Sequence, residues 1–157
     1  MIKPSKPDNE AQRLLALQRY QILDTPRERS FDDLVTIATA LCGTRMGAVT
    51  LVDQDRQWFK ARQLLEATQT HRDVSFCGHA ILQPDQVMVV EDARADPRFV
   101  DNPIVVDEPH IRFYAGAPLL SSDGLPLGTL CVFDAAPGQL SGGQRDALSA
   151  LSRQVSL

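Results

Sequence analysis

The strongest constraint on the fold is a pair of apolar stretches, residues 113–121 and 125–134, on either side of a short polar segment. Asp123 and Gly124 in that segment are a common turn signal, because both residues accept the backbone angles that a tight hairpin requires. The stretch MGAVTLVD and its partner QWFKARQ, separated by QDR, predict a second hairpin. The segment QVMVVED has the composition of a further buried strand. We therefore expect an antiparallel sheet.

Two amphipathic helices are predicted before this sheet. In the first, at residues 9–23, Asn9 stands where it can cap the helix. In the second, Thr25 and Glu28 form a T-x-x-E capping box, and apolar residues follow at helical spacing. Gly43 then occupies the C-terminal position that favours a left-handed residue. We therefore expect the second helix to begin at Thr25 and to end at Gly43.

Shorter helical segments are predicted in the second half of the chain. Ser75 can cap a short helix that runs to Leu82, and Asp96 precedes one helical turn that Pro103 closes. Otherwise residues 92–112 have the features of a long irregular connection. Loops of that length in compact domains tend to cover a site, so we expect this region to lie over one.

A C-terminal helix is predicted from Ser141, which forms a capping box with Gln144. Its apolar residues Leu148, Leu151 and Val155 are spaced by three and four, as in a short coiled-coil seam. No Gly or Pro stop follows before the sequence ends. We therefore expect this helix to continue toward an output domain.

Together these elements predict an α+β domain, in which terminal helices cover one antiparallel sheet. A chain of 157 residues supports one core, so we expect a flexible leader at residues 1–8 and a single domain at residues 9–157. The net charge of −4 gives no field that would gather nucleic acid. The odd number of cysteines, together with the lack of a signal peptide and of a long apolar run, favours a cytoplasmic protein without a membrane span.

The segment SFCGHAIL places Cys77 two positions from His79. Free backbone N–H groups at a helix start favour a thiolate, which makes Cys77 a candidate reactive cysteine. Residues i and i+2 point about 200° apart around a helix, however, so His79 is badly placed to act as its base. A zinc site needs four ligands, and neither His71 nor His110 has a second ligand beside it. We therefore expect no catalytic dyad and no metal site, and Cys77 and His79 either pack locally or line a cavity.

A second group of candidates lies where the long connection enters the strand that begins near residue 113. Arg112 with Asp92 could hold a polar or anionic ligand, while Phe76, Phe99 and Tyr114 could stack on a flat one. The same residues could equally form an ion pair and a small aromatic core, because pockets and cores share a composition. Both interpretations remain open at this point.

Several separated segments resemble, in the right order, a bacterial GAF domain of the signalling type. They are NEAQRLLALQRYQILDTPRERSFDDL, VTLVDQDRQWFKAR, SFCGHAIL, VVEDARADPRFVDNP, IRFYAGAPL and GLPLGTLCVFD. The resemblance implies a central antiparallel sheet of five or six strands, terminal helices on one face, and a pocket under a lid of short helices and loops on the other. It also implies a homodimer through the terminal helices and a covalently linked output domain, since such domains usually precede histidine kinase, diguanylate cyclase or PAS modules.

Better defined branches of the family match less well. The cyclic-nucleotide-binding branch carries a spread Asn-Lys-Phe-Asp-Glu pattern, of which this sequence offers Phe99 and Asp101. The free methionine sulfoxide reductases have a segment similar to the one around Cys77, but their second cysteine has no counterpart between Cys77 and Cys131. The resemblance therefore leaves the ligand and any cofactor unknown.

The leading hypothesis is a non-enzymatic sensory domain that binds a small molecule and transmits its occupancy through the terminal helices. The ligand-pocket candidates are Phe76, Cys77, His79, Asp92, Phe99, Arg112 and Tyr114. Two alternatives are a thiol-dependent reductase or redox sensor that uses Cys77, and a structural dimerisation module with a closed, empty pocket.

Overall fold

The centre of the fold is a six-stranded antiparallel sheet with the strand order β3-β2-β1-β6-β5-β4. The structure, a computed structural model, describes residues 1–155 and 157, so Ser156 of the predicted domain lies outside the described residues. The strands are β1 Met46–Val52, β2 Arg56–Gln63, β3 Gln69–His71, β4 Met88–Val90, β5 Phe113–Leu120 and β6 Pro126–Asp134. The α+β class, the sheet and both hairpins confirm the sequence prediction. Strand β3 was missed, since its segment was predicted as a polar loop.

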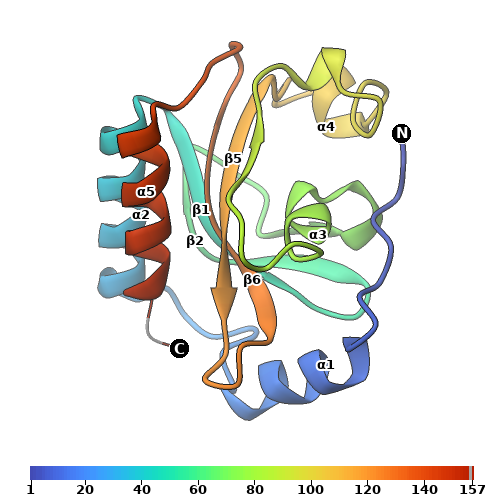
Figure 1. Cartoon of the computed structure of the whole chain (residues 1–157), viewed down its shortest axis with the longest axis vertical. Coiled ribbons are helices and arrows are strands. Elements are labelled where there is room, and N and C mark those ends of the chain that lie inside the picture. Colours follow the sequence, from blue (N-terminus) through green and yellow to red (C-terminus); the bar gives the residue numbers. More distant parts are fainter. Residues whose placement is uncertain (156) are drawn as a thin grey trace.

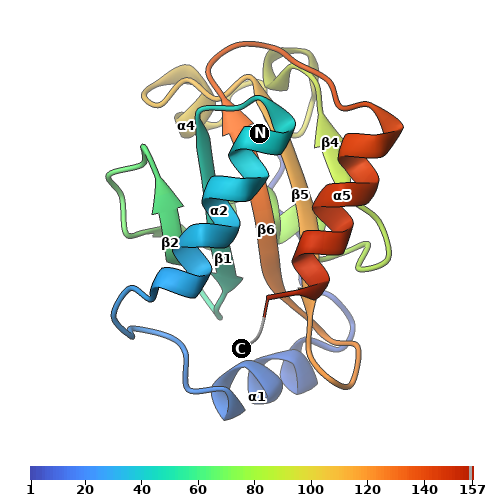
Figure 2. The same ribbon diagram turned by 90° about the vertical axis from the view of Figure 1, so that its left-hand side faces the viewer.

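Long helices cover one face of the sheet (Figure 2). α2 (Arg29–Cys42) and α5 (Gly142–Arg153) lie side by side across the strands, and α1 (Glu10–Arg19) lies across one end of them. Ala16 and Leu17 of α1 belong to the same buried cluster as the inner side chains of α2 and α5. The expectation of terminal helices on one face therefore holds for α2 and α5, whereas α1 closes the end of that layer.

The opposite face carries short helical segments (Figure 1). These are α3 (Phe76–Ala80), α4 (Pro103–Val106) and two single turns, η1 (Arg72–Val74) and η2 (Ala93–Ala95). Together with their loops they form the lid that the family resemblance implies. Among the described residues, none of the helices combines the length and the apolar character that crossing a membrane requires.

Alternation along the strands divides the core into two halves. On β6, Leu130 and Val132 belong to the cluster that includes Leu148 of α5, whereas Cys131 and Phe133 belong to the cluster beneath the lid. This follows from the strand geometry, in which successive side chains point to opposite faces of the sheet. The sheet is therefore buried on both sides, by long helices on one and by the lid on the other.

One helix start and one predicted cap differ from the sequence prediction. α2 begins at Arg29 rather than at Thr25. The reason is Lys60 on β2, whose buried ammonium donates to Thr25 Oγ1 at 2.8 Å and to the Pro26 carbonyl at 2.7 Å. These bonds hold the segment against the sheet and use the hydroxyl that would have capped a helix. Asn9 precedes α1 as predicted but makes no side-chain capping bond.

The connection at residues 92–112 is more regular than predicted. Pro103 does not close a helix but is the first residue of α4, a position where its missing N–H costs nothing. The Asn102 side chain caps this helix by accepting a hydrogen bond from the Ile104 N–H at 3.0 Å. Asn102 Nδ2 also donates to the Val74 carbonyl at 3.0 Å, which ties α4 to the segment before α3.

Residues 1–8 contain no helix or strand and run along the lid (Figure 1). Pro4 is buried against α3, where a Cβ on Gly78 would lie 2.8 Å from Pro4 Cγ. The Nε2–H of His79 donates to the Ile2 carbonyl at 2.9 Å. The N-terminal segment therefore packs against Gly78 and His79 of SFCGHAIL.

Candidate functional site

Four of the candidate residues meet in one aromatic stack beneath the lid. The rings of Phe76 and Phe99 are nearly parallel, with centroids 3.9 Å apart, and the Tyr114 ring lies 5.0 Å from that of Phe76. His79 meets Phe99 edge-on at 5.1 Å. Because α3, the loop before α4 and β5 each contribute to the stack, it fastens the lid to the sheet.

A cavity of about 130 Å³ lies between this stack and the sheet. An apolar cavity of about 150 Å³ in another protein binds benzene, so this one has room for a molecule of roughly one ring. The lining residues are Thr50, Gln57, Phe59, Leu65, Ala67, Thr70, Phe76, Ile104, Glu108, Pro109, Ile111, Tyr114, Cys131 and Phe133. Ala67 and Glu108 are exposed, so the mouth lies between the β2–β3 loop and the loop after α4.

Polar groups form one part of the cavity wall. Gln57 Nε2 donates to Thr70 Oγ1 at 2.9 Å, and Gln57 Oε1 accepts a hydrogen bond from the thiol of Cys77. Gln57 is only 6% exposed. Since a primary amide carries two N–H donors, one donor of this buried side chain has no partner among the described residues.

Tyr114 provides a second polar group. Its buried hydroxyl lies 3.4 Å from Thr129 Oγ1, which in turn lies 3.0 Å from Thr50 Oγ1. Hydrogen bonds between hydroxyl groups are normally about 2.7–2.8 Å long, so the bond of Tyr114 is a weak one. Burial raises the pKa of Tyr114 well above its ordinary value. The hydroxyl therefore keeps its proton and can donate.

The thiols in this region are buried and protonated at neutral pH. Cys77 has no exposed surface, and burial raises its pKa to about 11. Burial likewise raises the pKa of Cys131, which lines the cavity, to about 12. A pKa four units above the ambient pH leaves about one thiolate in ten thousand molecules. The helix start at Cys77 does not produce a reactive thiolate, because desolvation outweighs it.

Asp92 and Arg112 are not among the residues that line the cavity. The Asp92 carboxylate caps η2 by accepting from the Arg94 N–H at 3.0 Å, and it pairs with the Arg94 guanidinium at 2.9 Å. The hydrogen bond from Arg94 holds the pKa of Asp92 below its ordinary value. Arg112 donates to the Val105 carbonyl at 2.7 Å. Both side chains are thus engaged in holding the lid backbone.

The remaining candidates lie at different depths. Phe76 and Tyr114 line the cavity, and Phe99 supports Phe76 from behind. His79 faces the N-terminal segment, and burial lowers its pKa, which favours the neutral ring. Among residues 1–155 and 157, no three His, Cys, Asp or Glu side chains gather closely enough to hold a metal ion.

Sequence reasoning missed most of the cavity wall. The strands that carry Gln57, Thr50 and Phe133 were predicted, but the face of the sheet toward which these side chains point was not. The usable signal is the alternation along each strand together with the register, in which Tyr114 pairs with Phe133. Thr70 carried no such signal, because β3 has only three residues.

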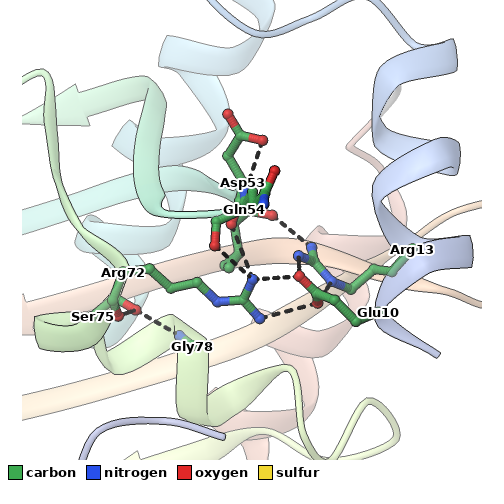
Figure 3. Close-up of polar contacts among 8 residues, drawn as sticks. Glu10, Arg13, Asp53, Gln54, Arg72, Ser75 and Gly78 are labelled. Carbon is green, nitrogen blue, oxygen red and sulfur yellow. Dashed lines mark hydrogen bonds and ion pairs between the residues drawn. The ribbon is translucent and has the colours of Figure 1, made fainter. Parts of the chain in front are cut away.

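A buried charge cluster connects this wall to α1 (Figure 3). The Glu10 carboxylate accepts from Arg72 Nη1 at 2.6 Å and from Arg13 Nε at 2.9 Å. Both guanidinium groups are almost fully buried. Burial alone would raise the pKa of Glu10, but the hydrogen bonds and charges of the two arginines lower it to about 2. Since Arg72 lies in the chain between the lining residues Thr70 and Phe76, the cluster ties the cavity wall to α1.

Comparison with known proteins identifies a family for this arrangement. The family model described as GAF domain matches residues 26–157. Among curated proteins, a cyclic di-GMP phosphodiesterase of Pseudomonas aeruginosa is 42% identical over 137 residues, which make up 87% of this chain and 23% of that protein. The chain therefore spans about a quarter of the length of the curated relative it matches.

Solved structures show the same fold at low identity. The GAF domain from a phosphoenolpyruvate-protein phosphotransferase of Coxiella burnetii aligns with a TM-score of 0.67 at 15% identity, covering 94% of this chain and 92% of that one. The free methionine-R-sulfoxide reductase of Neisseria meningitidis, solved with its substrate, aligns with a TM-score of 0.63 at 21% identity, covering 98% and 91%. At these identities the similarity is one of fold.

Proposed function

We propose, on the premise that this chain belongs to the GAF domain family, that it is the sensory domain of a bacterial signalling protein. The domain itself catalyses no reaction. A small molecule binds in the cavity beneath the lid, and its binding changes the activity of a linked output domain.

The cavity is the observation that carries this proposal. Its walls are mainly apolar and include the buried polar groups of Gln57 and Tyr114, which is the usual composition of a small-molecule site. A module with a purely structural role would fill such a space with side chains, because protein interiors are close-packed. The hypothesis of a dimerisation module with a closed pocket is therefore less well supported.

The contacts of Arg72 support a route for the signal. Thr70 and Phe76 line the cavity on either side of Arg72 in the chain, and Arg72 binds Glu10 of α1. A ligand that displaces either lining residue therefore acts on α1 through one short segment. The ligand must bind two arrangements of α1 with different affinity, because otherwise it shifts no population.

A linked output domain is part of the proposal. The relative from Pseudomonas aeruginosa is a phosphodiesterase, and the matched region is 23% of its length, so most of that protein lies outside the match. We expect an enzymatic or other signalling domain to be joined to the present chain in the same way. A cytoplasmic location is supported by the three cysteines, all of which are free.

A homodimer through the terminal helices is also proposed. On α2, the side chains of Ile37 and Leu41 are 51% and 39% exposed and lie four positions apart on one helix face. α5, which carries the half-buried Leu151, packs beside α2. An exposed apolar stripe of this kind is typical of a helix that packs against another chain.

A reductase or redox sensor that uses Cys77 is less well supported. At 21% identity, the similarity to the Neisseria meningitidis reductase shows only that the two proteins share a fold. A thiol must be accessible and ionised to attack a sulfoxide or a peroxide. The thiol of Cys77 has no exposed surface and a pKa of about 11.

The test is a melting-temperature screen of small metabolites against the parent chain and two variants of α4. Ile104 lines the cavity, whereas Val106 on the same short helix is 56% exposed. Ile104→Phe fills the cavity, and Val106→Phe adds the same ring outside it. A ligand at 100 times its Kd stabilises a folded protein by about 2.7 kcal/mol, which is readily measured.

A sensory cavity predicts at least one compound that raises the Tm of the parent and of Val106→Phe but not that of Ile104→Phe. The same compound should slow amide hydrogen exchange in α1. The proposal fails if no compound distinguishes the two variants, or if a cavity ligand leaves exchange in α1 unchanged.

A further inference from the structure

We propose that the cavity binds an uncharged molecule of about one aromatic ring that carries a single hydrogen-bonding group, as phenol does. This inference rests on the proposed sensory function and names the class of its ligand. The size, the charge, the shape and the polar groups of the cavity each limit what can bind.

The size of the cavity sets the upper limit. The volume of about 130 Å³ is slightly smaller than that of a cavity known to hold benzene. A nucleotide or a tetrapyrrole exceeds this space several-fold. The cyclic dinucleotide named for the Pseudomonas aeruginosa relative is larger still, so it does not fit inside the cavity in the present arrangement of the walls.

The charge of the wall excludes an anion. Among the residues that the structure describes, no Lys, Arg or His side chain lines the cavity. Arg72, two positions after the lining residue Thr70, is already bound to Glu10 and to the Asp53 carbonyl. A carboxylate or phosphate in this space would lose its hydration without gaining a counter-charge, which is strongly unfavourable.

A cation is disfavoured for a related reason. Four aromatic residues line the cavity, and ring faces attract cations such as quaternary ammonium groups. Such sites commonly complete the recognition with a carboxylate. Glu108 is the one charged residue among the described lining residues, and it is exposed at the mouth. A neutral ligand therefore fits the interior better than a charged one of either sign.

The aromatic walls favour a flat molecule. Phe76 is held in one orientation by the stacked ring of Phe99 at 3.9 Å. The Tyr114 ring lies along β5 over Gly116, where a Cβ would come within 2.8 Å of Tyr114 Cζ. Both rings are therefore fixed before a ligand arrives, and fixed ring faces pack best against another ring.

Two buried polar groups define where the hydrogen-bonding group of the ligand lies. Gln57 has one amide N–H without a partner among the described residues, and the Tyr114 hydroxyl makes a weak bond of 3.4 Å. In the strand order, β1 with the lining residue Thr50 lies between the strands that carry Gln57 and Thr129. A phenolic oxygen can accept from the N–H of Gln57 or exchange a hydrogen bond with Tyr114, so it can satisfy either group.

The experiment compares four probes that share one ring: toluene, phenol, benzoate and benzylammonium. Binding of each to the whole chain is measured by calorimetry at neutral pH, with Ile104→Phe as the filled-cavity control. We expect phenol to bind most tightly, toluene to bind more weakly, and the two ions not to bind in the cavity.

The variant Tyr114→Phe removes one oxygen and leaves the ring in place. Losing one neutral hydrogen bond should weaken phenol binding roughly three- to tenfold and leave toluene binding unchanged. Tyr20→Phe is the matched control, because the Tyr20 hydroxyl accepts from the Ser122 N–H and does not line the cavity. This control should bind phenol as the parent does.

The outcomes separate this inference from the proposed function. If benzoate or benzylammonium binds most tightly, and the binding is lost in Ile104→Phe, the neutral class is overturned while the sensory function stands. The same holds if no single-ring probe binds but the metabolite screen yields another cavity ligand. If neither experiment finds a cavity ligand, both proposals fail. Equal loss of phenol and toluene binding in Tyr114→Phe would overturn the role of the hydroxyl.

Discussion

On the face covered by α2 and α5, the buried side chains are mainly aliphatic and fill the space between sheet and helices. On the lid face, five of the twelve buried core residues that the structure describes are aromatic, and the packing leaves a cavity of about 130 Å³. Adjacent residues of one strand serve both faces, since Val132 points to the helices and Phe133 to the cavity. The two faces differ because the elements that cover them differ in length.

A long helix can bury a continuous apolar stripe, whereas a helix of one turn cannot. α2 has 14 residues and α5 has 12, but α3 has five and α4 has four. The lid is held by its aromatic stack, by side-chain bonds such as the one from Asn102 to the Val74 carbonyl, and by the Glu10 cluster. Short separate segments can open locally more readily than long helices, which suits a face that must admit a ligand.

The largest effect is expected where the lid side is anchored to α1. The substitution Glu10→Gln removes the carboxylate between two buried guanidinium groups, and leaving such charges uncompensated costs about 3–5 kcal/mol. Urea unfolding at pH 7 measures the loss. Glu66→Gln is the control, because Glu66 is exposed, and it should unfold as the parent does. A cost below about 1 kcal/mol would mean that the lid does not depend on this anchor.

The same cluster predicts a dependence of stability on pH. The pKa of Glu10 is about 2 in the folded chain against an ordinary value of 4.5. Because the folded pKa is the lower one, the stabilisation is complete above pH 4.5 and is lost as the pH falls toward 2. The free energies of unfolding of the parent and of Glu10→Gln, measured at a series of pH values, should therefore converge as the pH falls over this range. A constant difference between the two free energies down to pH 2 would contradict the assigned ion pairs.

The next largest effect is expected on the helix face. Leu130 has no exposed surface and lies in the close-packed aliphatic cluster, so Leu130→Ala should cost about 2–5 kcal/mol. Leu64→Ala, at a residue that is 73% exposed, should cost less than about 0.5 kcal/mol. Thermal or urea unfolding checks both values. Similar costs for the two variants would mean that this face is not the tightly packed one.

A smaller effect is expected from a truncation on the lid face. Ile111 lines the cavity, so Ile111→Val removes a methylene group beside space that already exists. Such a change typically costs about 0.5–1.5 kcal/mol, and we expect the lower half of that range. Ile22→Val removes the same group from the aliphatic cluster, so it is the matched comparison and should cost more. If Ile111→Val costs more, the two faces do not differ in packing as described.

No reaction is expected at Cys77 in the folded chain. Its thiol is buried with a pKa of about 11, so iodoacetamide at pH 8 should leave it unmodified. All three cysteines should react in urea, which provides the control. Rapid alkylation of Cys77 without urea would show that the lid opens more readily than its contacts imply, and would revive the redox alternative.

The elements were predictable wherever one local signal decided them. The Ser141–Gln144 capping box starts α5 as expected, and Gly43 ends α2 with a φ angle of 69°. The signal at Thr25 was equally good but failed, because Lys60, 35 residues away, binds the same hydroxyl. Strand β3 escaped prediction because its three residues exist as a strand only through pairing with β2.

The candidate site residues divide in the same way, into those that a local sequence signal identified and those that only distant contacts decided. Phe76 and Tyr114 were identified because aromatic residues in SFCGHAIL and IRFYAGAPL stand out in the sequence, and both line the cavity. Asp92 and Arg112 stood out equally, but folding engages each of them with the lid backbone. Gln57 carried no local signal at all, since its importance comes from burial beside Thr70 and Cys77.

Hydrophobic periodicity and capping residues were therefore sufficient for the class of fold, the two hairpins and the long helices, because these depend on neighbours within a few positions. The cavity could arise only in the folded chain. Its walls come from strands and short helices far apart in the sequence, and its existence depends on how completely their side chains fill the space between them. Packing of that kind is a property of three-dimensional neighbours, which no local pattern encodes.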